Sequence, residues 1–388
     1  MLPLVSDFCE PEPKDVKWMI NHRDLALAAM RGELVERVPF IARMELWYNY
    51  NANRGTLPDH YQNWSLWDIQ RDLGIGIFGF GAWDQSFYKT ELHGVNVTRT
   101  TDNGTGVTNF DTPFGKLTAM DRMSDELMEA AGTGARIEFP FKSPSDYDAL
   151  EYLLDNTEIV DNFDNYGKFV EEIGTDGIAL PFSGYLHAHQ LMINYMGYER
   201  FYYELYENES RLLRLVDAIE RQQNEILSLA AQSPSQAIEV GGNYDEQMTP
   251  PPIFERFFSP FYKKAHEVLS ASSKVLVIHG DGEMKKLLSL IKDCGVQVVE
   301  AVTPKPMTSI DIKQVRELWG DEVTLWGGLP SIIFTPVFTD AEFETHIEEL
   351  FETIGEGKRF ILGFGDNAPT DAMFQRIKRI AKFWNEKR

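Results

Sequence analysis

The segment Val277-Ile-His-Gly-Asp-Gly282 decides the fold class, because in it an apolar run leads directly into polar residues and a glycine. The run Val275–Ile278 is typical of a strand buried on both faces, as in a parallel sheet, and a helix-like run follows Gly282. His279 and Asp281 then lie at the carboxyl end of a strand, where α/β proteins form their active sites. Because they have like parity, they point the same way if the strand geometry persists. This pattern predicts a metal site or an acid–base pair.

The composition indicates one large domain or two smaller ones. Of the 388 residues, 43% are hydrophobic, and no apolar run is long enough to span a bilayer. The net charge of −23 disfavours nucleic acid and anionic membranes as partners. Only Cys9 and Cys294 are present, and the N-terminus lacks the basic and apolar regions of a signal peptide. We therefore expect a cytoplasmic protein without disulfides.

Short β-like runs, most of them followed by helical patterns, recur along the chain and predict a single (β/α)8 TIM barrel of the α/β class. A doubly wound open sheet is the alternative. The eight predicted strands are Val38–Trp47, Gly74–Gly81, Gly177–Gly184, Ala237–Asn243, Lys274–Asp281, Val296–Val302, Val323–Leu329 and Arg359–Asp366.

Two further segments are predicted outside the repeating βα pattern. Residues 1–36 read as an N-terminal helical extension packed on a barrel of residues 37–388. Between the second and third strands, alternating β-branched residues flank Asn103-Gly104. This dipeptide favours a tight turn, so a β-hairpin insertion is expected at about 94–122.

Several polar side chains fall at or just past the predicted strand ends, and a barrel would bring them together at its catalytic face. One imidazole among several carboxylates could bind a divalent cation, with zinc as the first expectation. Salt bridges across the barrel mouth are the alternative interpretation. The candidate catalytic residues are Asp84, Glu239, His279, Asp281 and Asp366, and the candidate metal ligands are His279, Asp281, Asp366 and Glu239.

Aromatic residues are dense near the first two strands, and those just past the strand ends could line a pocket for an aromatic substrate. Many of them are also expected in the core. His187 follows the third strand and is a candidate for the same pocket, with a capping or surface role as the alternative. The candidate substrate-binding residues are Arg43, Trp47, Tyr48, Trp83 and His187.

From Arg37 to its end, the chain resembles the uroporphyrinogen decarboxylase superfamily. The resemblance implies a (β/α)8 barrel, in agreement with the strand count. It rests on the order and spacing of Arg37-Val-Pro-Phe40, Gly197-Tyr-Glu-Arg-Phe201, Phe254–Tyr262, Val277–Gly282, Leu325-Trp-Gly-Gly-Leu-Pro330 and Phe360–Gly365.

Two departures from the porphyrinogen decarboxylases speak against an octa-acid substrate. Those enzymes resemble one another in an Arg-x-x-x-Arg element that holds substrate carboxylates. Here Arg43 is present, but Trp47 stands at the position of the second arginine. They also carry a histidine between two glycines on the last strand, where this chain has Phe364.

The chain is more similar to the methyltransferase branch, whose members exchange methyl groups with a corrinoid protein. The resemblance implies a zinc site built from a His-x-Cys pair and a later cysteine. By position these are His279, Asp281 and Asp366, so both thiolates are replaced by carboxylates. Oxygen ligands suit an ether or hydroxyl substrate better than a thiol.

The resemblance thus implies an O-demethylase-type methyltransferase. It would move a methyl group from a methoxylated, aromatic small molecule to cobalt, assisted by zinc or another divalent metal. The sequence has no Asp-x-His-x-x-Gly element of a corrinoid-carrying domain, so a partner corrinoid protein is expected to supply the cobalamin. A metal-free lyase on a small carboxylated substrate and a non-catalytic barrel subunit are the alternatives. Assembly as a homodimer is left open.

Overall fold

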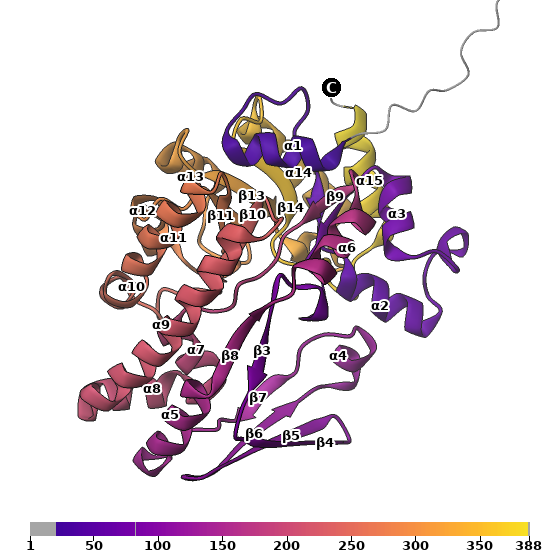
Figure 1. Cartoon of the computed structure of the whole chain (residues 1–388). Helices are drawn as coiled ribbons and strands as arrows, with labels where there is room; N and C mark the ends of the chain where they lie inside the picture. The colour runs from indigo at the N-terminus through magenta and orange to yellow at the C-terminus, as the bar shows by residue number, and fades with distance from the viewer. Residues whose placement is uncertain (1–20, 82, 387–388) are drawn as a thin grey trace, which may run out of the picture.

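The computed structural model of the chain describes residues 21–81 and 83–386 (Figure 1). In these residues eight parallel strands form two sheets. Each strand lies inside one of the eight predicted segments, so these predictions are confirmed. One sheet contains β1 (Ile41–Ala42), β2 (Gly76–Gly79) and β9 (Gly177–Ala179). The other contains β10 (Ala237–Gly242), β11 (Val275–His279), β12 (Val298–Val302), β13 (Thr324–Leu329) and β14 (Phe360–Phe364).

Isolated parallel bridges connect the two sheets at both of their edges. Phe40, before β1, pairs with Leu362 of β14, and Phe182, after β9, pairs with Glu239 of β10. The hydrogen-bonded ladders of the described residues do not form one continuous closed sheet. The strand order nevertheless follows the chain order, whereas a doubly wound sheet reverses direction at a switch point.

Residues of one parity on the strands form an inner apolar core together with helix α1 (His22–Arg31). This core includes Phe78 of β2, Val277 of β11 and Trp326 of β13. The last turn of α1 is held by Thr324, whose hydroxyl donates to the Ala29 carbonyl at 2.9 Å. Of the predicted extension at 1–36, residues 1–20 lie outside the described part of the chain.

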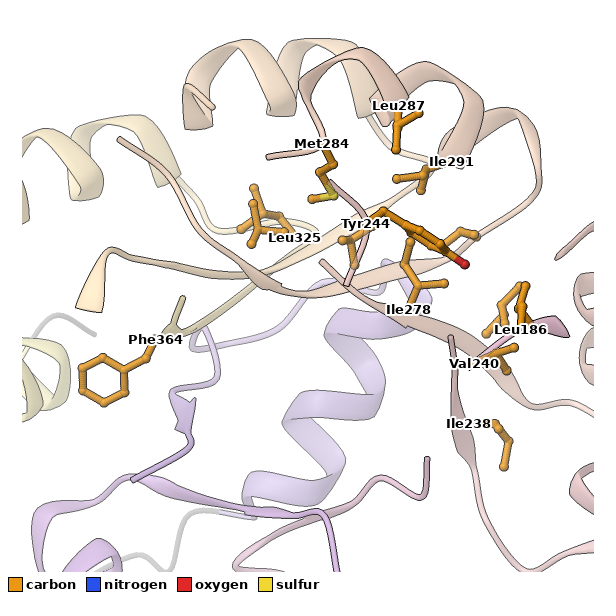
Figure 2. Close-up of a cluster of buried hydrophobic side chains, with 14 of the residues drawn as sticks. Leu186, Ile238, Val240, Tyr244, Ile278, Met284, Leu287, Ile291, Leu325 and Phe364 are labelled. Carbon is orange, nitrogen blue, oxygen red and sulfur yellow. The ribbon is translucent and has the colours of Figure 1, made fainter. Parts of the chain in front are cut away.

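Residues of the opposite parity form the outer core against the surrounding helices. Figure 2 shows part of it, including Ile238, Ile278, Leu325 and Phe364. Besides α1, and α2 and α4 described below, the α-helices of the described residues are α3 (Leu66–Leu73), α5 (Tyr147–Asp155), α6 (Phe163–Ile173), α7 (His187–Gln190), α8 (Gly197–Glu207), α9 (Glu209–Gln232), α10 (Pro251–Phe257), α11 (Ser259–Ala271), α12 (Leu288–Asp293), α13 (Ile312–Trp319), α14 (Asp340–Ile354) and α15 (Phe374–Glu386). No helix of the described residues is long and apolar enough to cross a membrane.

An antiparallel sheet is inserted between β2 and β9, at the opposite end of the molecule from α1 (Figure 1). Its first two strands join at Asn103-Gly104, where both residues have positive φ, as a tight hairpin turn requires. The sheet is larger than the predicted hairpin at 94–122, because a fourth strand follows helix α4 (Asp125–Glu129). The strands are β4 (Asn96–Asp102), β5 (Thr105–Thr112), β6 (Gly115–Arg122) and β7 (Ala135–Glu138), and β3 (Tyr88–Leu92) pairs separately with β8 (Thr157–Asp161).

The first strand is shorter than predicted, and this changes the setting of two candidate residues. β1 ends at Ala42, and helix α2 (Glu45–Arg54) begins three residues later. Trp47 and Tyr48 were expected on or just past a strand end and instead lie on this helix. Their aromatic character favours strands in isolation, but Gly55 in the left-handed conformation ends a helix here.

We predict that Gly177→Ala disrupts the pairing of β9 with β2. A Cβ at Gly177 would lie 2.0 Å from the backbone oxygen of Ile77, so the strands would have to separate. We expect a loss of at least about 2–3 kcal/mol in the free energy of unfolding, measured by urea denaturation.

The matched control is Gly167→Ala on α6, where an added Cβ meets nothing within 4 Å. This substitution should be neutral or stabilising by roughly 0.5–1 kcal/mol, because alanine favours helix. Equal effects of the two substitutions would contradict the packing argument.

Candidate functional site

Three neighbouring strands direct ionisable side chains to the interior at their carboxyl ends. Glu239, His279 and Glu300 share the parity of the inner core residues of β10, β11 and β12, so they extend that face beyond its apolar part. His279 and Glu300 are direct neighbours in the register of β11 and β12. All three side chains are buried. The interior is therefore apolar next to α1 and charged at the opposite end.

His279 is the centre of this group, and its two ring nitrogens face different carboxylates. Nδ1 lies 2.5 Å from Glu300 Oε2 and 3.9 Å from Glu239 Oε1. Nε2 lies 3.7 Å from Asp281 Oδ2 and 3.8 Å from Asp366 Oδ1. The structure thus brings together all four metal ligands predicted from the sequence, and adds Glu300.

Arg43 supplies the guanidinium of the site. Its Nη1 pairs with Asp366 Oδ1 at 2.5 Å, and its guanidinium carbon lies 5.5 Å from the ring centres of both Phe78 and Phe80. The turn after β14 is fixed on the same side, where Asn367 donates to Glu45 at 3.2 Å. Arg43 therefore holds a candidate ligand rather than standing free for a substrate carboxylate.

Carboxyl groups outnumber cationic groups in this cluster, and the pKa values of several of its members are shifted as a result. Burial and the neighbouring Glu300 carboxylate raise the pKa of Glu239 to about 8. Burial opposes protonation of His279, but Glu300, Asp281 and Glu239 outweigh it, so the pKa of the imidazole lies well above its usual value. Burial also opposes ionisation of Asp281, yet His279 and Arg43 hold the pKa of its carboxyl below the usual value. An added cation would be stabilised at this position.

The backbone is strained at three strand ends around the cluster. Asn243 after β10, Ala301 on β12 and Asp366 after β14 have φ values of 56°, 59° and 76°. Residues other than glycine rarely adopt this left-handed conformation, and such strain concentrates at functional sites.

The other predicted residues lie elsewhere. Trp47 is buried in the outer core and stacks on Phe374 at 5.5 Å, and Tyr48 donates to the Trp64 carbonyl at 2.9 Å. His187 is buried against Phe258, and burial lowers its pKa to about 4, so it is a neutral packing residue. Asp84 lies exposed on the short helix η2 (Trp83–Gln85). The side chain of Trp83 is outside the described part of the structure.

Three aromatic residues that the sequence analysis did not single out for the pocket line the charged cluster instead. Phe80 follows β2 and is 41% exposed, and its ring stacks on Phe182 at 6.0 Å. Phe182 contacts Tyr185 edge-on at 5.2 Å. Burial raises the pKa of the Tyr185 hydroxyl, and the nearby charges of His279 and Asp281 lower and raise it, respectively. Strand parity could have indicated Phe80 and Phe182, since both continue an inward-facing series.

Residues 95–386 match the uroporphyrinogen decarboxylase (URO-D) family. The chain belongs to the uroporphyrinogen decarboxylase family. The predicted resemblance is thereby confirmed, and the family fold is a TIM barrel. A methyltransferase from Methanosarcina mazei has a similar structure, with a TM-score of 0.56 and 14% sequence identity over 95% of this chain and 99% of that one. Comparison with curated proteins finds no match.

The two positions at which this family member was expected to depart from the decarboxylases both lie in the outer core. Trp47 packs on Phe374, and Phe364 packs edge-on against Phe334 at 4.8 Å. Neither side chain supplies a charge to the strand ends. Among the described residues near His279, the cationic side chain is that of Arg43, and it is paired with Asp366.

The residues around His279 fit a divalent ion. Two ligands on a tetrahedral zinc, at bond lengths of about 2.0–2.1 Å, lie roughly 3.3 Å apart. The spacings of 3.7 and 3.8 Å from Nε2 to Asp281 and Asp366 are close to this value. Glu239 Oε2 is buried and has no hydrogen-bond partner among the described residues, so the hydrogen-bonding capacity of the cluster is not fully used. Carboxylate and imidazole donors suit zinc and similar ions.

We predict that Glu239→Gln stabilises the protein increasingly as the pH rises. The folded-state pKa of about 8 exceeds the usual value of 4.5, so Glu239 stabilises the fold below pH 4.5 and loses this contribution between pH 4.5 and about 8. Glutamine does not titrate. The gain over wild type should grow to at most about 5 kcal/mol at pH values above about 8, measured by denaturant unfolding of metal-free protein.

The control is Glu352→Gln, an exposed position on α14. Its stability difference from wild type should be nearly constant over this pH range. A constant difference for Glu239→Gln as well would contradict the raised pKa.

Proposed function

We propose that this protein is a methyltransferase that moves a methyl group from a methoxylated aromatic molecule to the cobalt of a partner corrinoid protein. The observation that carries the proposal is the set of oxygen and nitrogen donors around His279, placed beside partly exposed aromatic rings. Membership of the URO-D family and the similar fold of a named methyltransferase support it.

We place this site at the mouth of a (β/α)8 barrel. Eight parallel strands succeed one another in chain order, and isolated bridges link the outer strands of the two sheets. In such barrels the active site lies at the carboxyl ends of the strands. His279 and Asp366 lie at or just after two of these ends, and Glu300 lies two residues before a third.

The aromatic rings support an aromatic substrate. Phe80, Phe182 and Tyr185 form a partly exposed row beside Arg43, and a planar ring could stack on it. Asn243 donates to the Tyr185 hydroxyl at 2.9 Å and fixes its orientation. A methoxy group on such a ring would then be directed toward His279.

In the reaction the bond between the ether oxygen and the methyl carbon breaks. The electron pair of cobalt(I) forms the new bond to carbon, and the aryl oxygen leaves as phenolate and takes up a proton. Stabilising the developing phenolate is where the protein lowers the barrier. A divalent ion held by His279 and the neighbouring carboxylates would supply Lewis-acid stabilisation of that oxygen. The proton would come from solvent, because Asp281 and Asp366 on the Nε2 side of His279 are partly exposed.

We predict that Asp366→Asn lowers the rate of methyl transfer by about a hundredfold without unfolding the protein. Asparagine keeps the volume but loses the charge near His279 Nε2. The measurement is conversion of cobalt(I) to methyl-cobalt(III) absorbance with a panel of methoxyarenes. The control is Asp321→Asn, an exposed carboxylate paired with Lys358.

Different failures of this assay have different meanings. Reaction with methylamines or thiols but no methoxyarene would leave a methyltransferase with another donor. If no donor converts the cobalt, the methyltransferase proposal is wrong. Turnover of uroporphyrinogen at a decarboxylase-like rate would establish the lyase alternative instead.

We also predict that Phe80→Ala raises KM for the methoxyarene by about three- to tenfold and changes kcat much less. The ring is expected to bind ground state and transition state alike, and a stacked pair contributes roughly 0.5–1.5 kcal/mol. Phe114→Ala, at a 60% exposed position on the antiparallel sheet, is the control. An unchanged KM for Phe80→Ala would remove the aromatic row from the substrate site.

A further inference from the structure

His279 is shared by two groups of potential metal ligands, and a bound ion could use either. One group is His279 with Glu239 and Glu300, and the other is His279 with Asp281 and Asp366. The first faces Nδ1 and is fully buried, whereas the second faces Nε2 and is partly exposed. The hydrogen bond of the imidazole distinguishes between them.

Nδ1 is already engaged, because it lies at hydrogen-bond distance from Glu300, 2.5 Å. A neutral imidazole carries its proton on one nitrogen and a lone pair on the other. Because the Glu300 carboxylate can only accept, it favours the tautomer with the proton on Nδ1. When an ion displaces the proton of Nε2, the imidazole is neutral, and the lone pair of Nε2 points toward Asp281 and Asp366.

Glu300 is itself held firmly in this position. It lies on a central strand, with β11 and β13 on either side, and the Gly280 amide donates to its carbonyl at 2.7 Å. The register of β12 with β13 shifts between Val299 and Val302, and Ala301 has a φ of 59°. Irregularities of this kind redirect individual side chains. Here the irregularity flanks the residue that meets Nδ1.

We propose that Glu300 is a positioning residue: it fixes the tautomer and orientation of His279 so that Nε2, Asp281 and Asp366 bind the metal. This inference rests on the proposed metal-assisted function. Glu300 and Glu239 are then not ligands, and Glu239 lies on the side of the imidazole that the Nδ1 proton occupies. Carboxylates that accept from the second nitrogen of a ligating histidine typically contribute 10–100-fold in metal affinity.

The test is zinc affinity of the full chain, measured by competition with a chromophoric chelator. Glu300→Gln should weaken binding by about 10–100-fold and keep a stoichiometry of about one. Glu300→Asp, which keeps the charge on a shorter side chain, should give an intermediate affinity. Asp281→Asn and Asp366→Asn should each weaken binding more than Glu300→Gln. Glu239→Gln should change the affinity by less than about threefold.

A second readout reports the tautomer directly and would not respond to a merely structural role. In zinc-loaded protein with ¹⁵N-labelled histidine, long-range ¹H–¹⁵N spectra should show His279 protonated at Nδ1 and ligated at Nε2. The Glu300→Gln spectrum should show this preference weakened. Glu204→Gln, at a buried glutamate of α8 outside the cluster, controls for loss of a buried carboxylate and should leave affinity and spectrum unchanged.

Three results would overturn the proposal. The first is an absence of zinc binding by the wild-type chain. The second is wild-type zinc affinity in Glu300→Gln. The third is loss of zinc in both Glu239→Gln and Glu300→Gln while Asp281→Asn and Asp366→Asn bind normally, which would make Glu300 a ligand. Because these outcomes concern metal binding, they are independent of the methyl-transfer assay. A protein that binds zinc as predicted but transfers no methyl group would contradict only the proposed function.

Discussion

The site depends on a surplus of negative charge that the strand ends force into one place. Glu239, Asp281, Glu300 and Asp366 all lie near a single imidazole, and one guanidinium, that of Arg43, pairs with the last of them. Charges away from water cannot remain uncompensated without a large cost. The chain meets this cost by keeping a proton on Glu239 and by raising the pKa of His279. A divalent cation would relieve the same surplus.

The fold remains stable despite the charged cluster because the interior has an apolar half and a charged half. Near α1, the inward-facing residues are apolar and tightly packed, so the strands are held in register independently of the charged end. At the carboxyl ends the same parity delivers ionisable groups. Strain at Asn243, Ala301 and Asp366 is thus borne by a scaffold whose stability comes from elsewhere.

Strand periodicity was sufficient to predict the eight strands and the convergence of His279, Asp281, Glu239 and Asp366, because buried strands and their ends have strong local signatures. It could not predict where β1 ends, because the aromatic residues after Glu45 are also common in strands but lie on helix α2 here. Trp47 was misplaced for that reason. The sequence places Glu300 on the sixth predicted strand. The nitrogen of His279 that Glu300 contacts depends on the register between β11 and β12, and this register is set by tertiary structure.

The replacement of thiolates by carboxylates connects the donor set to the substrate class. By resemblance, Asp281 and Asp366 occupy positions where related methyltransferases carry cysteines. Thiolates donate more electron density to a zinc ion and favour soft partners, whereas the harder carboxylates, of the same charge, leave it a stronger Lewis acid toward oxygen. An ether oxygen is a poor leaving group until its developing charge is stabilised, so it gains most from such an ion. The adjacent row of Phe80, Phe182 and Tyr185 would hold the ring to which that oxygen is attached. Donor hardness and aromatic surface therefore both support the proposed substrate, an aryl methyl ether.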